Sequence, residues 1–134
     1  MNPNDLPREL THEASADELI AAVRVVSQGP LAQVVEACDR EGFYPREVLQ
    51  QLGALGAFSA HLDAPVGRAD YGLAIRAMAE VSRVCGATGF MVWCQAVCGL
   101  YMQASGNPAL MGEALTAHAS GATLGGTGMS NPMK

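Results

Sequence analysis

Aromatic residues are scarce in this sequence, which has one Trp, three Tyr and three Phe among 134 residues. Since 49% of the chain is nevertheless hydrophobic, its core has to be built mainly from Ala, Leu, Val and Met. Such small and mostly unbranched side chains favour packed helices. At this length, a single domain with a real core is expected.

Basic residues are also few, with eight Lys and Arg against thirteen Asp and Glu, which gives a net charge of −5. They are scattered and form no stripe that would follow a phosphate backbone, so nucleic acid is excluded as a partner. The N-terminus lacks a basic segment followed by an apolar one, and no apolar run reaches membrane-spanning length. These absences predict a cytoplasmic protein that does not enter a membrane.

The four cysteines form no CxxC pair and lack the dense spacing of a disulfide framework, so free thiols are expected. Cys94 and Cys98 are four residues apart and share a helical face, which is also a spacing of metal ligands. No His or carboxylate lies near them in the sequence. Packing in the core is therefore favoured, and no metal site is predicted.

Helical periodicity begins near residue 15. Residues 15–18, SADE, have the pattern of a capping box and open an apolar pattern over residues 19–26. Gly29 and Pro30 are expected to break this helix, because proline has no amide hydrogen to donate. A second helix, with apolar residues at helical spacing, is predicted to end near Gly42.

Two further helices are predicted on either side of a loop. Pro45 starts a helix that ends at Gly56, a residue suited to the left-handed conformation that closes helices. Asp70 is expected to cap a helix that ends around Cys85. The segment 57–69 between them contains a Pro and a Gly and is predicted to be a loop.

The helix predicted over residues 88–104 is apolar nearly all the way round, which is typical of a central, buried helix. A sixth helix is predicted over residues 108–118. The chain then becomes glycine-rich, with a short alternation typical of a starting strand. The predicted fold is mainly α, an up-and-down bundle of about six helices, with a C-terminal Gly-rich strand or loop that starts a β domain. The predicted divisions are an N-terminal segment 1–14, a helical domain 15–119 and the start of a truncated middle domain 120–134.

Three stretches of the sequence follow a recognisable order. Residues 37–58, ACDREGFYPREVLQQLGALGAF, have an Asp, a Gly-aromatic-Pro entry and a Leu-x-x-Leu-Gly exit. Residues 64–93, APVGRADYGLAIRAMAEVSRVCGATGFMVW, have a loop with Pro and Gly, then an acidic residue that opens a helix with a Glu near its end. Residues 126–132, GTGMSNP, end in Ser-Asn-Pro. Together they resemble the N-terminal helical domain of the acyl-CoA dehydrogenase family, which has Thr-Glu-Pro at the last position.

The resemblance implies an FAD-dependent enzyme in which a short strand contacts the pyrimidine edge of the flavin. Carried over to this sequence, that strand contributes Thr127, Met129 and Ser130 to cofactor binding. In the family, the helix that corresponds to residues 88–104 lines one wall of the acyl-chain pocket, so Gln95 is a candidate pocket residue. The resemblance also implies an acyl-CoA substrate, an electron-transfer acceptor and a homo-oligomer.

The activity implied by the resemblance is α,β-dehydrogenation of acyl-CoA thioesters, as in fatty acid metabolism. In the family, the catalytic base is a Glu from a C-terminal helical domain, and a middle β domain makes most flavin contacts. No catalytic residue is therefore predicted within residues 1–134, and this chain alone is expected to be inactive.

Three carboxylates at polar helical positions have no like-charged neighbour to shift their pKa, and solvated or ion-paired roles are predicted for them: Glu36, Glu80 and Glu113. The three histidines lie far apart and beside no Ser or Cys of a nucleophile motif, so surface or loop positions are predicted: His12, His61 and His118.

Two other functions remain open. Flavin-dependent monooxygenases of the same fold need no Glu base, and Asn131 in place of the family's Glu favours them. The second alternative is a helical interaction module without catalytic activity. An exposed apolar face on the helix over residues 88–104 would bind a partner.

Overall fold

The computed structural model describes residues 8–126 and 128, and every regular element within this part of the chain is a helix. The elements are α1 (Arg8–Val26), η2 (Ser27–Leu31), α2 (Ala32–Glu41), α3 (Arg46–Leu55), α4 (Tyr71–Ser82), α5 (Gly86–Ala104), α6 (Pro108–Met111) and α7 (Glu113–Ala119). The α class predicted from the sequence is confirmed. Of the helices described, none is both long and apolar enough to cross a membrane.

The first helix begins earlier than predicted. The capping box predicts a start at Ser15, whereas α1 begins at Arg8 and passes through residues 15–18. Residues 8–14, RELTHEA, include Arg, Leu, Ala and two Glu, which are strong helix formers, and Ser inside a helix costs only about 0.5 kcal/mol. The predicted start is therefore wrong, because the helix propensity of residues 8–14 outweighs the preference of the capping box for a helix start at Ser15.

Gly29 and Pro30 do not break the helix but lie in η2, a π-helical turn that joins α1 to α2. Pro30 cannot donate a hydrogen bond, and its ring needs space against the preceding turn. The wider π turn provides that space, with the Ala32 amide donating to the Ser27 carbonyl. The buried Ser27 hydroxyl also donates to the Val23 carbonyl at 2.8 Å. The predicted break is wrong because one widened turn accommodates the proline.

Other predicted helix boundaries are confirmed. Gly42 (φ 67°) and Gly56 (φ 89°) follow α2 and α3 in the left-handed conformation, which glycine adopts without a Cβ clash. The Asp70 carboxylate accepts a hydrogen bond from the Leu73 amide at 2.9 Å and thus caps α4. α4 ends at Ser82, a little before the predicted end.

The last predicted helix is in fact two. α6 and α7 meet at Gly112, whose backbone angles (φ −94°, ψ −119°) are far from helical. The expected strand does not appear in residues 120–126 or 128, because a strand needs a pairing partner and the described residues supply none. The remainder of the predicted strand, residues 127 and 129–134, lies outside the described residues.

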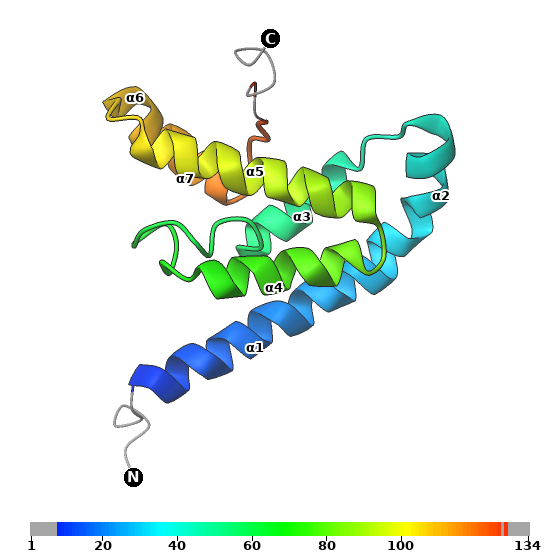
Figure 1. Cartoon of the computed structure of the whole chain (residues 1–134), viewed down its shortest axis with the longest axis horizontal. Coiled ribbons are helices and arrows are strands. Elements are labelled where there is room, and N and C mark those ends of the chain that lie inside the picture. The colour runs from blue at the N-terminus through cyan, green and yellow to red at the C-terminus, as the bar shows by residue number, and fades with distance from the viewer. Residues whose placement is uncertain (1–7, 127, 129–134) are drawn as a thin grey trace.

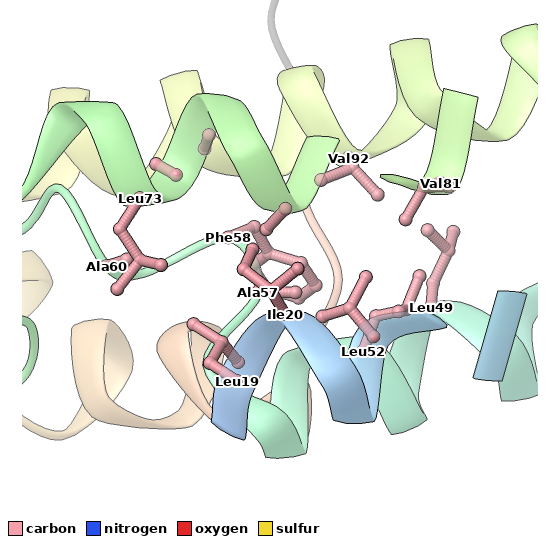
Figure 2. Packing of buried hydrophobic residues seen from close by; sticks show 14 of the residues in the cluster. Leu19, Ile20, Leu49, Leu52, Ala57, Phe58, Ala60, Leu73, Val81 and Val92 are labelled. Atoms are coloured by element: carbon pink, nitrogen blue, oxygen red, sulfur yellow. The ribbon is translucent and has the colours of Figure 1, made fainter. Parts of the chain in front are cut away.

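α4 lies between α1 and α5 and packs against both, and α4 and α5 run in opposite directions (Figure 1). α3 packs against α1, while α7 packs against α5 and α3. A single large apolar cluster fills the space among these helices. In Figure 2 its side chains converge from α1, α3, α4 and α5: Leu19, Ile20, Leu49, Leu52, Leu73, Val81 and Val92.

The loop predicted over residues 57–69 is not helical, and its first half is buried. Phe58 is 1% exposed and lies within the core cluster (Figure 2). Gly67 is packed so closely that an added Cβ would overlap the carbonyl oxygens of Ser59 and Leu62. Only glycine fits there, so the loop has one tight path, which brings its buried residues against α5.

Candidate functional site

α5 buries one side and exposes the other. Its buried side contains Thr88, Gly89, Val92, Gln95, Ala96 and Gly99. On the other side, Phe90, Trp93 and Tyr101 are 63%, 37% and 45% exposed. The rings of Phe90 and Trp93 stack with centroids 5.4 Å apart. The prediction of a helix buried all round is wrong for these residues, because α4 and α7 cover only one side of α5.

Gln95 is the polar residue at the centre of the buried side and is 2% exposed. Its Nε2 donates a hydrogen bond to the Gly125 carbonyl at 2.6 Å, and its Oε1 accepts one from the Gly125 amide at 2.9 Å. These two hydrogen bonds give partners to the buried side-chain amide of Gln95 and to the N–H and C=O groups of Gly125. The pocket role of Gln95 stays a prediction, and the partner observed for its amide is the chain that follows α7.

His118 of α7 contacts the same turn of α5 and is 2% exposed. Its Nε2 donates to the Gln95 carbonyl at 2.8 Å, and since a carbonyl only accepts, Nε2 carries the proton. A Cβ added at Gly99 would lie 3.4 Å from the His118 ring, so the ring packs against α5 at this turn. The predicted surface or loop position of His118 is wrong, because it lies in a helix and is buried.

An apolar cavity of 170 Å³ lies between α4 and α5. Ile75 and Met78 of α4 and Trp93, Val97 and Leu100 of α5 contribute to its lining. Ligand pockets usually have volumes of about 300 Å³ or more. This cavity is therefore too small for a whole cofactor.

His61, from the loop over residues 57–69, also lines this cavity. Its Nε2 donates to the Ala96 carbonyl at 2.8 Å, its ring lies 5.7 Å from that of Tyr71, and its Nδ1 has no partner among the described residues. Burial lowers the pKa of His61 below its ordinary value, an effect opposed by the bond to Ala96. The imidazole is therefore neutral at pH 7. The predicted loop position of His61 is confirmed, while a surface position is wrong because the residue is 5% exposed.

Two larger hollows lie away from these groups. One, of 390 Å³, is bordered by α3, the loop over residues 57–69 and α7, and the other, of 440 Å³, lies between η2 and the start of α3. Neither is lined by Gln95 or His61. The buried side chains of Gln95, His61 and His118 thus form their hydrogen bonds at α5 and not at these two hollows.

Glu80 of α4 forms an ion pair that ties α4 to α1. Arg24 donates to both of its carboxylate oxygens, at 2.9 and 3.2 Å, and Arg83 lies 3.3 Å from one of them. The hydrogen bond from Arg24, together with the charges of Arg24 and Arg83, holds the pKa of Glu80 below its ordinary value. Glu36 pairs with Arg40 at 3.1 Å. The ion-paired roles predicted for Glu80 and Glu36 are confirmed.

The thiols on the helices are free cysteines. Burial raises the pKa of Cys94 and that of Cys38, which makes both thiols poor nucleophiles near pH 7. Among the described residues, no group of three or more His, Cys, Asp or Glu is arranged to hold a metal ion. Cys98 faces the segment after α7, because a Cβ added at Gly125 would lie 2.6 Å from its Sγ.

The structure therefore describes one of the four residues predicted for the site. Gln95 lies on α5 against Gly125, while Thr127, Met129 and Ser130 lie outside the described residues. His61 and His118, which bond to two successive carbonyls of α5, were not predicted as site residues. Nothing local marked either histidine, since both reach α5 from elements distant in sequence. Only the chain fold brings them there.

The described residues thus form an all-α array in which one apolar, partly exposed helix, α5, holds the segment that follows α7. Residues 13–122 match the family model described as acyl-CoA dehydrogenase, N-terminal domain. Because this match covers most of the 134 residues, the chain belongs to the acyl-CoA dehydrogenase family. Comparisons with curated proteins and with solved structures give no significant match.

The family is FAD-dependent and its name implies an acyl-CoA substrate. Of the glycine-rich segment that precedes and includes the predicted flavin contacts, the structure describes Gly125, Gly126 and Gly128. Gly125 is held on both of its peptide groups by Gln95, and an added Cβ at Gly126 or Gly128 meets nothing within 4 Å. The backbone is thus anchored at one residue and open to an approaching group at its neighbours.

Proposed function

We propose that this chain forms the helical domain of an FAD-dependent oxidoreductase that dehydrogenates acyl-CoA thioesters between their α and β carbons. The observation that supports this function is the arrangement of α5. One side of that helix exposes Phe90 and Trp93 beside an apolar cavity, and the other side holds Gly125 through Gln95. A single helix thereby connects an apolar wall suited to an acyl chain with the segment proposed to reach the flavin.

The reaction removes a proton from the α carbon and a hydride from the β carbon, so a base and a hydride acceptor have to stand on opposite sides of the substrate. When bound, FAD supplies the hydride acceptor. Two of the described carboxylates, Glu80 and Glu36, do not suit the base, because Glu80 is held ionised by Arg24 and Glu36 pairs with Arg40 at the surface. In the family, by resemblance, a Glu of a C-terminal helical domain is the base.

The residues of this chain contribute to binding and orienting the substrate and the flavin. The cavity between α4 and α5 offers apolar contact from Ile75, Met78 and Val97, which removes alkyl surface from water. The neutral His61 adds no charge to that wall. Thr127, Met129 and Ser130 are proposed to contact the pyrimidine edge of the flavin, and Gln95 is proposed to border the site.

The test is made on the protein as its gene encodes it, mixed with FAD and a series of saturated acyl-CoA thioesters without oxygen. Loss of the visible flavin absorbance and formation of the 2-enoyl thioester are expected. The 134-residue chain alone, with an artificial electron acceptor, is expected to give no turnover. Flavin that stays oxidised with every thioester would argue against the dehydrogenase function.

A flavin-dependent monooxygenase is the second candidate, and Asn131 at the position of the family's Glu favours it. This activity would consume oxygen and a reduced flavin and add a hydroxyl group to the product. Oxygen uptake coupled to a hydroxylated product, without enoyl thioester, would decide for the monooxygenase. A chain that binds neither flavin nor thioester but associates through the exposed face of α5 would instead support a helical interaction module.

The cellular setting follows from the same proposal. The family resemblance implies an electron-transfer acceptor and a homo-oligomer, and a cytoplasmic location stays a prediction. Co-purification of the intact protein with its redox partner and light scattering would test the first two.

A further inference from the structure

The hollow of 390 Å³ at the C-terminal end of α3 has no part in the proposed function. It is bordered by α3, the loop over residues 57–69 and α7. Its volume lies within the range of about 300 to 1,000 Å³ that is usual for sites of small molecules. One charged side chain, several hydroxyl groups and several aliphatic side chains line it, so its chemistry can be compared with that of a ligand.

Ser59, in the loop, contributes an unpaired hydroxyl group to this hollow. The residue is 5% exposed and lines the hollow, and its hydroxyl forms no hydrogen bond with any described residue. A Cβ added at Gly56, which also lines the hollow, would lie 3.7 Å from the Ser59 Oγ, so the hydroxyl lies beside the end of α3. Buried hydroxyl groups normally have a partner, and a ligand in the hollow would supply one.

Arg68 adds a positive charge on the same side of the hollow. Its amide donates to the Ala60 carbonyl at 3.1 Å, which holds it beside the residue that follows Ser59. Among the described residues, its guanidinium has no ion-pair partner, and no carboxylate lines the hollow. A guanidinium binds a carboxylate through two parallel N–H groups. The loop side of the hollow therefore offers hydrogen-bond donors to an anionic group.

The helix side of the hollow offers acceptors. Ala54 and Leu55 lie in the last turn of α3, and their carbonyls accept no hydrogen bond from the described residues. Thr116 and Ser120 line the hollow as well, and their hydroxyl groups already donate to backbone carbonyls. Unpaired carbonyls at the C-terminal end of a helix favour N–H donors and cations. A ligand that meets both sides therefore needs an anionic group and a cationic donor.

We propose that this hollow binds a small free amino acid with an aliphatic side chain. The carboxylate of the ligand pairs with Arg68 and accepts a hydrogen bond from the Ser59 hydroxyl, and its ammonium group donates to the acceptors at the end of α3. Its side chain contacts Leu19 and Val66, which removes apolar surface from water. Binding at this site does not depend on the flavin or on the proposed dehydrogenase function.

Isothermal titration calorimetry with the intact protein tests the class of ligand. L-leucine is expected to bind, and three analogues that each lack one group are the controls. Isocaproate lacks the ammonium group, isoamylamine lacks the carboxylate and glycine lacks the aliphatic side chain. Each analogue is expected to have a Kd about tenfold higher than that of L-leucine, because each loses one set of contacts. An analogue that binds as tightly as L-leucine would overturn the assignment to an amino acid.

Arg68→Gln and Arg46→Gln are the matched variants. Both arginines are exposed, but Arg46 lines the separate hollow of 440 Å³. Arg68→Gln is expected to raise the Kd for L-leucine about tenfold, and Arg46→Gln is expected to leave it unchanged. Ser59→Ala, which removes only the unpaired hydroxyl, is also expected to raise the Kd about tenfold, because a hydrogen bond to a charged group is lost. Circular dichroism checks that each variant is folded.

NMR spectra recorded during the titration locate the ligand. The backbone amides of Gly56 and Gly67 line the hollow and are expected to shift on addition of L-leucine, whereas that of Gly42, after α2, is expected to stay in place. Absence of L-leucine binding would overturn the proposal. An unchanged Kd in Arg68→Gln, or shifts at Gly42 without shifts at Gly56, would overturn it as well, because the ligand would then bind elsewhere.

Discussion

The packing of α1, α3 and α4 relies more on apolar side chains than the packing of α5, α7 and the segment after α7. The first region is joined by Leu, Ile and Val side chains that interdigitate in one cluster (Figure 2). The second has only a small apolar cluster of its own, around Leu62 and Leu115, and is joined in addition by hydrogen bonds of Gln95 and His118 to backbone. Apolar packing is non-directional and tolerates repacking, whereas hydrogen bonds set a position.

The difference indicates that the two regions contribute differently to the stability and to the geometry of the domain. The apolar region supplies most of the free energy of folding, because each fully buried aliphatic side chain contributes about 1.5 to 3 kcal/mol. The polar region contributes less per contact but fixes where the chain leaves the helices. Substitutions in the two regions should therefore separate stability from geometry.

The largest effect is expected from Leu52→Ala in the apolar region. Leu52 is 0% exposed, and removing its side chain leaves a cavity that destabilises the fold by about 3 kcal/mol. Urea unfolding followed by circular dichroism measures this loss. Leu55→Ala on the same helix is the control, since Leu55 is 37% exposed and its truncation should cost about 0.5 kcal/mol. Equal losses at the two positions would contradict the described core.

The next largest loss of stability is expected from Gly53→Ala, at the point where the two regions meet. A Cβ at Gly53 would lie 2.5 Å from the Gly121 Cα and 2.5 Å from the Phe58 ring, so α3 and the chain after α7 have to move apart. Such overpacking costs about 2 kcal/mol, measured by the same unfolding experiment. Gly29→Ala has no atom within 4 Å of its Cβ and should leave stability unchanged or slightly higher. A tolerated Gly53→Ala would mean that this contact is looser than described.

Acid should weaken the α5 region first. The folded-state pKa of His61 is lowered by burial, so its neutral form stabilises the fold above the unfolded-state value of about 6.5, and this stability is lost as the pH falls below it. The free energy of unfolding is expected to decrease between pH 7 and 5 in wild type. In His61→Gln, which can still donate to the Ala96 carbonyl, the decrease should be smaller. An unchanged slope would assign the titration to another group.

The tie between α1 and α4 should weaken only at lower pH. Arg24 holds the folded-state pKa of Glu80 below its ordinary value, so the pair stabilises the fold above the unfolded-state value of about 4.3 and is lost as the pH falls below that. Glu80→Gln is expected to remove the part of the acid response that lies below pH 4.3. Unfolding curves at pH 5 and pH 3 measure the difference, and a response identical to wild type would contradict the assignment.

The smallest effect is expected at the exposed pair of Arg76 and Asp17. Their nitrogen and oxygen lie 3.2 Å apart, but the side chains are 54% and 75% exposed, so water and salt screen the attraction. Asp17→Asn should leave the unfolding midpoint unchanged within error at physiological ionic strength. A clear loss would show that this surface pair contributes more than its exposure indicates.

Much of the apolar region could be predicted from local patterns. Periodic Leu and Val, the Asp70 cap and the glycines after α2 and α3 act within one turn of chain, and the structure has them at the predicted places. The errors lie where a distant contact or a rare turn overrides the local pattern. The π turn at Pro30 and the division at Gly112 are both backbone adjustments that composition does not reveal.

The sequence by itself determined the α class, most helix boundaries and the family, because these depend on periodicity, caps and ordered motifs close together in the chain. The tertiary structure alone decided that Gln95 pairs with Gly125 and that His118 and His61 bond to successive α5 carbonyls. The physical reason is that a buried polar side chain takes whichever unpaired donor or acceptor the fold brings to it. These partners are distant in sequence, so no local pattern predicts them. The position of the segment after α7 therefore followed only from the tertiary structure.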